Sequence, residues 1–146
     1  MNVRTRLALS SDIEGIFDVR ISVKENHLSR EEMEQMGITE SSVIDMIEKN
    51  RCAWVAVDNG KIIGFSMILP DEGSLFAAFV LPEYEGRGVG RSLVQLAEQE
   101  LFKHHEVAWL ETDKNSRAAK IYKRLGWVEK ENVSESDIRL EELSCF

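Results

Sequence analysis

Residues 75–102 read LFAAFVLPEYEGRGVGRSLVQLAEQELF, an apolar run that leads through three closely spaced glycines into a segment of helical periodicity. The run has no polar side chain before Pro82, so it predicts a central strand that is buried on both faces. After the glycines, apolar residues repeat with the period of a helix, which predicts a helix to about Lys103. Its apolar stripe consists of Val89, Leu93, Leu96, Ala97 and Leu101. The stretch therefore predicts a strand, a glycine-rich turn and a helix.

The glycine-rich turn has the composition of an anion-binding site. At the start of a helix the backbone N–H groups lack partners, and the helix dipole adds positive partial charge there. Glycine lets a ligand approach the backbone, and two arginines can add charge-assisted hydrogen bonds. We therefore expect a phosphate to bind at Gly86, Arg87, Gly88, Val89, Gly90 and Arg91.

The spacing of these glycines excludes two common nucleotide-binding loops. A dinucleotide fingerprint, G-x-G-x-x-G, needs a glycine where this chain has Arg91 or Leu93. A Walker A loop needs a glycine at position 85, which is Glu. An isolated GxG is more often a tight packing turn. The flanking strand and helix, together with the two arginines, favour an anion site here.

Patterns on the N-terminal side predict strands and helices separated by turns. Ser11 and Glu14 have the spacing of a capping box, which would begin a helix over about 12–24. Asn59-Gly60 predicts a tight β-hairpin, and residues 70–73 predict a second turn. The predicted strands are 3–9, 52–58, 61–69 and 74–81, whereas 29–50 has only a marginal helical pattern.

On the C-terminal side a strand is predicted over 106–112, parallel to 74–81 because a helix separates the two. Asn115 would cap a helix that continues to Leu125, and Gly126 suits the C-terminal end of that helix. Strands over 127–130 and 137–143 would complete the sheet. We expect one α+β domain over 1–146, with a mixed, mostly antiparallel sheet of six to seven strands, a central parallel strand pair and flanking helices.

Composition and charge exclude several classes of protein. The chain has 146 residues and a formal net charge of −8, which disfavours binding to nucleic acid. Its longest apolar run is too short to span a membrane, and its first ten residues lack the long apolar stretch of a signal peptide, so we expect a cytoplasmic protein without membrane partners. The two cysteines and three histidines lack the spacing of a zinc site, and we expect no metal. The sequence does not decide between a monomer and a homodimer.

Charge is unevenly distributed along the chain. Residues 114–124 contain five basic side chains and no acid, which favours binding of an anion. Residues 25–48 contain seven acids and one arginine. If this acidic segment lies beside a substrate site, it would favour a cationic amine. A charge run of this kind is more often a solvated helix face.

Two stretches resemble motifs of the GNAT superfamily of acyl-CoA-dependent N-acetyltransferases. Residues 80–91, VLPEYEGRGVGR, resemble its pyrophosphate-binding motif R/Q-x-x-G-x-G/A, with Gly88 and Gly90 at the glycine positions. Residues 115–127, NSRAAKIYKRLGW, resemble its second cofactor motif, N-x-x-A-x-x-x-Y-x-K-x-G-F. Glu85 departs from the first motif, since the family usually has Arg or Gln there. The resemblance implies a GNAT-like fold, with acetyl-CoA as cosubstrate.

The resemblance also implies roles for individual residues. The backbone of Phe79 and Val80 would pair with the pantetheine arm, and 86–91 would hold the pyrophosphate. Asn115 would contact the cofactor, and Tyr122 would face its sulfur. The basic side chains that could reach the 3′-phosphate are Arg117, Lys120 and Arg124. Independently of the family, helical spacing places 115, 118, 119 and 122 on one face.

The implied reaction is attack by a neutral primary amine, of a small molecule, peptide or protein, on the thioester of acetyl-CoA. Tyr122 would be the general acid, because a phenol can protonate the departing thiolate. Glu111, at the end of a predicted strand, matches a glutamate that some family members use as the base. Glu25, His27, Tyr84 and a chain of water molecules are further candidates for the base.

A second function, from a different class, is a non-catalytic acyl-CoA-binding sensor or interaction module. Glu85 and the unassigned base keep this second function open, whereas Tyr122 and the Asn115 motif favour the enzyme. A nucleotide-binding regulatory domain is a third and weaker interpretation.

Overall fold

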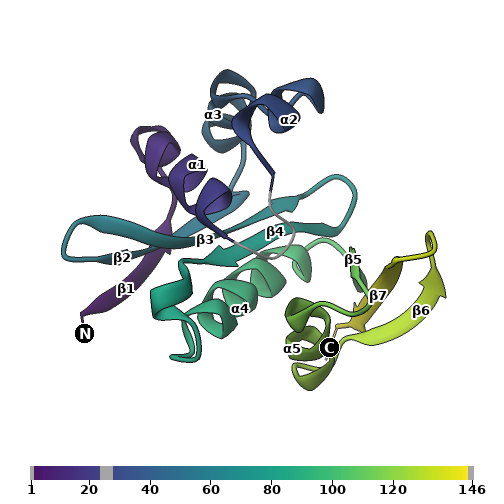
Figure 1. Cartoon of the computed structure of the whole chain (residues 1–146). Coiled ribbons are helices and arrows are strands. Elements are labelled where there is room, and N and C mark those ends of the chain that lie inside the picture. The colour runs from purple at the N-terminus through teal and green to yellow at the C-terminus, as the bar shows by residue number, and fades with distance from the viewer. Residues whose placement is uncertain (1, 24–27, 145–146) are drawn as a thin grey trace.

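Seven strands form one sheet in the computed structural model, which describes residues 2–23 and 28–144 (Figure 1). The strands are β1 (Val3–Leu7), β2 (Ala53–Asp58), β3 (Lys61–Leu69), β4 (Ser74–Val80), β5 (Val107–Asp113), β6 (Val128–Asn132) and β7 (Asp137–Leu143). Their order across the sheet is β1-β2-β3-β4-β5-β7-β6. β4 and β5 are parallel, and the other neighbouring strands are antiparallel. The predicted α+β class with a central parallel pair is therefore confirmed.

Helices cover both faces of the sheet (Figure 1). One side carries α1 (Ile13–Ser22), α2 (Arg30–Gln35) and α3 (Glu40–Lys49), and the other carries α4 (Val89–Leu101) and α5 (Arg117–Arg124). α1 approaches β3 so closely that a Cβ on Gly15 would lie 2.6 Å from Cγ1 of Ile62. On the opposite face, the Ser66 hydroxyl of β3 donates a 3.0 Å hydrogen bond to the carbonyl of Leu93 in α4. The hydrophobic core therefore lies on both sides of β3.

The predicted hairpin between β2 and β3 is confirmed. Its turn consists of Asn59 and Gly60, which have φ angles of 49° and 81°. Two consecutive residues with positive φ match the twist of the flanking strands, and Asn-Gly adopts this geometry at the lowest cost.

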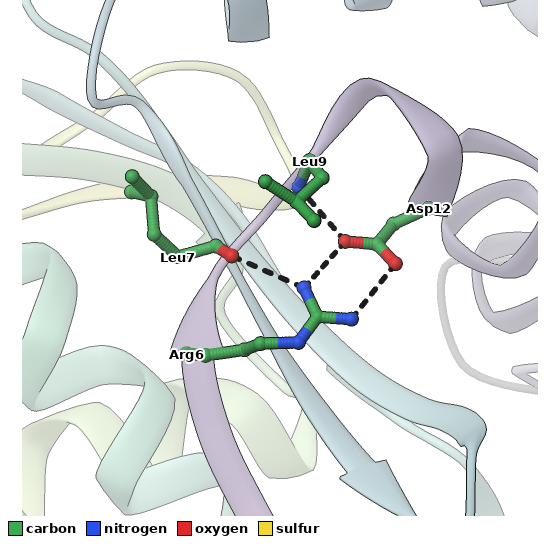
Figure 2. A network of polar contacts seen from close by, with 4 residues as sticks. All are labelled: Arg6, Leu7, Leu9 and Asp12. Atoms are coloured by element: carbon green, nitrogen blue, oxygen red, sulfur yellow. Dashed lines mark hydrogen bonds and ion pairs between the residues drawn. The ribbon is translucent and has the colours of Figure 1, made fainter.

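The predicted capping box at Ser11 and Glu14, at the start of α1, is wrong. Figure 2 shows that the carboxylate of Asp12 accepts hydrogen bonds from the Leu9 N–H at 2.8 Å and from the Arg6 guanidinium at 2.7 and 3.0 Å. A charged acceptor makes stronger hydrogen bonds than a hydroxyl, and Arg6 reaches it from β1. The hydrogen bond from Arg6 holds the pKa of Asp12 below its ordinary value. α1 therefore begins after Asp12 and is tied to β1.

The marginal segment 29–50 contains two short helices, each begun by its own cap. Ser29 accepts a hydrogen bond from the Glu32 N–H at 3.1 Å, and Thr39 accepts one from the Ser42 N–H at 3.1 Å.

The predicted N-cap at Asn115 is wrong, because the hydroxyl of Ser116 accepts from the Ala119 N–H at 3.0 Å and so caps α5.

The expectation that both faces of the central strand are buried is also wrong. Ser74 and Leu75, at the start of β4, are buried, but Phe76 is 45% exposed and residues 77–80 are only half-buried. An apolar sequence indicates burial only when neighbouring elements cover the strand. The second half of β4 lacks that cover on one edge.

Candidate cofactor and catalytic site

The second half of β4 has an unpaired backbone edge on the side of β5. The parallel register between the two strands consists of Ser74 opposite Trp109, where the Trp109 N–H also donates to the Gly73 carbonyl at 3.1 Å. Just beyond, Ala77 lies opposite Met67 and Leu75 opposite Ile68, so Phe76 is an extra residue in β4. Such a bulge bends its strand and increases the local twist. The bulge at Phe76 therefore accounts for the separation of β4 from β5.

The pleat of β4 decides which backbone groups face this edge. The Leu81 N–H donates to the Ile63 carbonyl of β3 at 2.9 Å, and alternate residues turn their polar groups to the same side. The backbone groups of Phe79 therefore face β3, and those of Ala78 and Val80 face the unpaired edge. The Phe79 side chain lies on the α1 face, where the Arg20 guanidinium is 4.2 Å from its ring centroid. Val80 and Ala78 are thus the residues placed to bond an extended ligand through their backbone.

The glycine-rich turn follows β4 after a short 3-10 helix, Pro82–Tyr84, and is open to solvent. Gly86 and Gly88 have φ angles of 76° and 81°, and a Cβ at either residue would meet nothing within 4 Å. Gly88 is the N-cap of α4, and this helix has neither a side-chain cap nor an acid in its first turn. A Cβ at Gly90 would lie 3.7 Å from Cγ2 of Val80, an ordinary van der Waals contact, so α4 packs against β4 at this residue. The open backbone and the positive end of α4 fit an anionic diphosphate.

Tyr84 ties this turn to the β2–β3 hairpin. Its hydroxyl donates a 2.5 Å hydrogen bond to Oδ2 of Asp58, and Arg87 lies 5.6 Å from the centre of its ring. The bond to Asp58 raises the pKa of Tyr84. A phenol that stays protonated against a carboxylate is not favoured as the base. Glu25 and His27, which were also candidates for the base, lie outside the described residues.

The second motif lies at the end of β5 and along α5. Asn115 is exposed in the turn before the helix, where its N–H donates to Oδ1 of Asp113 at 2.8 Å. Ala119 and Tyr122 form the buried side of α5, and the Tyr122 ring lies edge-on to Trp127 at 5.8 Å. Arg117, also exposed, pairs with Glu85 at 2.7 Å.

Glu111 lies on the other face of the sheet from Tyr122. Ala108 and Leu110 of β5 are buried, and Ala108 is opposite Glu142 of β7, which borders α4 and α5. Glu111 alternates with these residues, so its exposed side chain points away from α5. The two predicted catalytic groups therefore flank β5 from opposite faces.

A pair of carboxyl groups beside Tyr122 was not predicted from the sequence. Glu98 of α4 and Glu142 of β7 border a cavity of about 1050 Å³ between α4 and α5. The remaining lining includes Arg91, Gln95, Phe102, Ile121 and Arg124. Two sequence signals for this pair were available. Glu98 has helical spacing from the apolar Val94 and Leu101, and Glu142 alternates with the apolar Ile138 and Leu140.

Burial and a hydrogen bond to Glu142 raise the pKa of Glu98 to about 8. The negative charge of Glu142 also disfavours ionisation of Glu98. Burial and, secondarily, the charge of Glu98 raise the pKa of Tyr122 well above its ordinary value. The Tyr122 phenol is therefore fully protonated at neutral pH.

The raised pKa of Glu98 predicts a pH-dependent gain in stability for Glu98→Gln. The folded protein keeps a proton that the unfolded chain loses above about pH 4.5, so wild-type stability falls as pH rises from about 4.5 to about 8. Glutamine has no proton to lose. The full shift corresponds to about 5 kcal/mol. Because the Glu98 carboxyl borders an open cavity, where solvent screens such effects, we expect the variant to gain less, roughly 2 kcal/mol over wild type between these two pH values.

Urea unfolding of both proteins at pH 4.5, 6 and 8 measures this gain. The exposed Glu106→Gln serves as the control and should track wild type. A stability difference between Glu98→Gln and wild type that stays constant with pH would contradict the raised pKa of Glu98.

Two further properties concern residues 2–23 and 28–144. No cluster of three or more His, Cys, Asp or Glu side chains there could hold a metal ion. Among the helices built from those residues, none is long and apolar enough to cross a membrane.

Comparisons with known proteins agree with this geometry. Residues 14–127 match the model of the acetyltransferase (GNAT) family. The ribosomal protein bS18-alanine N-acetyltransferase of Haemophilus influenzae is 34% identical over 76 residues, which cover 50% of this chain and 52% of that protein. The chain thus matches about half the length of this curated relative.

Two solved structures share the fold over nearly the whole chain. The Paia N-acetyltransferase of Thermoplasma acidophilum, in complex with coenzyme A, has a TM-score of 0.78 at 18% identity, with 99% of this chain and 100% of that chain covered. Ard1 of Thermoplasma volcanium has a TM-score of 0.80 at 14% identity, with both chains covered completely. Because the family model extends from α1 through the glycine-rich turn and α5 to Trp127, this chain belongs to the acetyltransferase (GNAT) family.

Proposed function

We propose that this protein is an N-acetyltransferase that moves an acetyl group from acetyl-CoA to a primary amine. The observation that carries the proposal is the unpaired edge of β4 leading directly into an open, glycine-rich helix start. An extended arm with a diphosphate at one end and a thioester at the other matches these two features in order. Family membership supports the same ligand.

The cosubstrate would be held mainly by backbone groups. The diphosphate would accept hydrogen bonds from the amides of residues 86–91, with Arg87 and Arg91 beside it. The arm would pair with the edge of β4 through Ala78 and Val80, in place of the missing partner strand. Asn115, Arg117 and Arg124 would complete the site from α5 and the turn before it. Main-chain binding of this kind is compatible with Glu85 at the position where the family has Arg or Gln.

The two proton transfers would be carried out by side chains on opposite faces of β5. Glu111 would take a proton from the ammonium form of the acceptor, because only a neutral amine has a lone pair for attack on the thioester carbon. Tyr122 would donate a hydrogen bond, and then its proton, to the departing thiolate. The placement of the two side chains on opposite faces supports this division, since the attacking amine and the departing sulfur occupy different positions around the acyl carbon and can be served by different groups. Holding both reactants at one edge also makes the reaction effectively unimolecular.

The acceptor is proposed only as a primary amine of a small molecule, peptide or protein. The acidic side chains of α2 and α3, which lie on the α1 side of the sheet, would favour a cationic acceptor. The curated relative acts on an alanine of a ribosomal protein, so peptides with N-terminal alanine belong in any acceptor screen.

A two-stage experiment tests the proposed function. Calorimetry with CoA and acetyl-CoA is expected to show saturable binding. Incubation with acetyl-CoA and a panel of amines, polyamines, amino acids and peptides is expected to give an acceptor that gains an acetyl group by mass, with release of free thiol. Binding without transfer to any acceptor would support the non-catalytic module instead. Absence of binding at millimolar CoA would refute both.

A further inference from the structure

An ion pair joins the two elements that flank the unpaired edge of β4. Nη1 of Arg117 lies 2.7 Å from Oε2 of Glu85. Glu85 directly precedes the first glycine of the glycine-rich turn, and this turn comes after β4. Arg117 is the first residue of α5, and this helix comes after β5. At their other ends these two strands are joined by the pairing of Ser74 and Trp109. The ion pair therefore connects the chain segments that follow the two separated strand ends.

Both partners of this pair are solvated. The Arg117 and Glu85 side chains are 60% and 42% exposed. Ion pairs with this exposure shift an equilibrium by at most roughly fivefold. The pair is thus too weak to hold the fold together and can open at small cost.

Glu85 also has an unfavourable position for a ligand with several negative charges. It is the only acid among residues 85–91, whose backbone would bind the diphosphate. A carboxylate next to that site repels a phosphate, whereas a guanidinium attracts it. Phosphate is in addition a better partner for arginine than an exposed carboxylate, because it carries more charge and accepts two parallel hydrogen bonds.

We propose that Glu85 and Arg117 form an exchange pair, in which a phosphate of the bound CoA takes the Arg117 guanidinium from Glu85. This inference rests on the proposed function for the identity of the ligand. In the protein without bound CoA, Glu85 holds Arg117 near the glycine-rich turn. On binding, Arg117 leaves Glu85 for the phosphate, and the carboxylate stays behind as a repulsive charge. Glu85 therefore lowers the affinity for CoA, and Arg117 raises it.

A double-mutant cycle tests this exchange by calorimetric titration of CoA into wild type, Glu85→Gln, Arg117→Met and the double variant. Glu85→Gln is expected to tighten binding about fivefold, since no pair then needs to break and the repulsion is gone. Arg117→Met is expected to weaken binding about tenfold. In the Arg117→Met background the gain from Glu85→Gln is expected to fall below about twofold, because only the screened repulsion is left.

A matched control separates this effect from a general change in charge. Asp45→Asn on α3 also removes one carboxylate from an exposed ion pair, with Lys49 at 3.0 Å. It changes net charge by the same amount and is expected to leave CoA affinity unchanged. Repeating the Arg117 comparison with 3′-dephospho-CoA identifies the phosphate. A loss of affinity that persists assigns the diphosphate, and a loss that disappears assigns the 3′-phosphate.

Three outcomes overturn the exchange. If Glu85→Gln weakens binding, Glu85 positions Arg117 and does not compete for it. If Glu85→Gln gives equal gains in both backgrounds, the two side chains are not coupled. If Arg117→Met has no effect on either ligand, Arg117 contacts no phosphate. In each case wild type still binds CoA, so these results are distinct from failure of the proposed function, in which wild type itself does not bind.

Discussion

Replacement of Tyr122 by Phe is expected to lower kcat about 100-fold while CoA affinity changes less than about threefold. The phenol is buried, and both burial and the charge of Glu98 raise its pKa, so it carries its proton at neutral pH. Complete transfer to a thiolate, whose ordinary pKa is near 8.5, is then uphill. The expected loss therefore lies at the lower end of the usual range for general acids, about 10²- to 10⁴-fold.

The substitution keeps the aromatic ring that packs edge-on against Trp127, so the fold should be little affected. Steady-state kinetics with the acceptor found in the screen, together with calorimetry of CoA, separates kcat from binding. Tyr84→Phe is the matched control, because it also removes one phenolic hydroxyl, here from the bond to Asp58. Its effect should appear in CoA affinity and not in kcat. An unchanged kcat in Tyr122→Phe would remove this residue from the mechanism.

Replacement of Gly88 by Ala is expected to weaken CoA binding by about 10- to 100-fold. At a φ of 81° an L-residue is strained by about 1–2 kcal/mol, which would shift the amides at the start of α4. The new Cβ would also extend into open space where the diphosphate is proposed to lie. Both effects act on the same site and in the same direction.

Gly37→Ala provides a closely matched control for this prediction. Gly37 follows α2, has a φ of 82°, and its Cβ would likewise meet nothing within 4 Å. Both variants should therefore lose a similar amount of stability in thermal unfolding, about 1–2 kcal/mol. Only Gly88→Ala should lose CoA affinity in calorimetry. Equal CoA affinities in the two variants would place the diphosphate elsewhere.

Most of the fold could be predicted because its signals are local. The Asn59-Gly60 dipeptide identified the β2–β3 hairpin, and the change of period after the glycines identified α4. The strand, helix, strand order then predicted the parallel pairing of β4 and β5. The helix caps were predicted less well. Asp12 replaced Ser11 because Arg6 of a neighbouring strand reaches its carboxylate, which no local pattern indicates.

The candidate site was predicted in part, and for the same reason. The glycine-rich turn and α5 were found from spacing, and in the structure the Arg117–Glu85 ion pair links α5 to the start of the turn. Ala78 was missed, because the pleat of β4 relative to β3 decides which backbone groups are unpaired. Glu98 and Glu142 were missed as a pair, because they are far apart in the chain and meet only across the packed α4 and β7.

By itself, the sequence determined the order of the elements, the family and the exposed backbone of the glycine-rich turn, since each depends on residues close together in the chain. Only the tertiary structure decided that β4 and β5 separate beyond Ser74 and Trp109, that Glu85 pairs with Arg117, and that Glu98 and Glu142 border one cavity. These features depend on how strands and helices pack against one another, and packing brings together side chains whose separation in the sequence carries no signal.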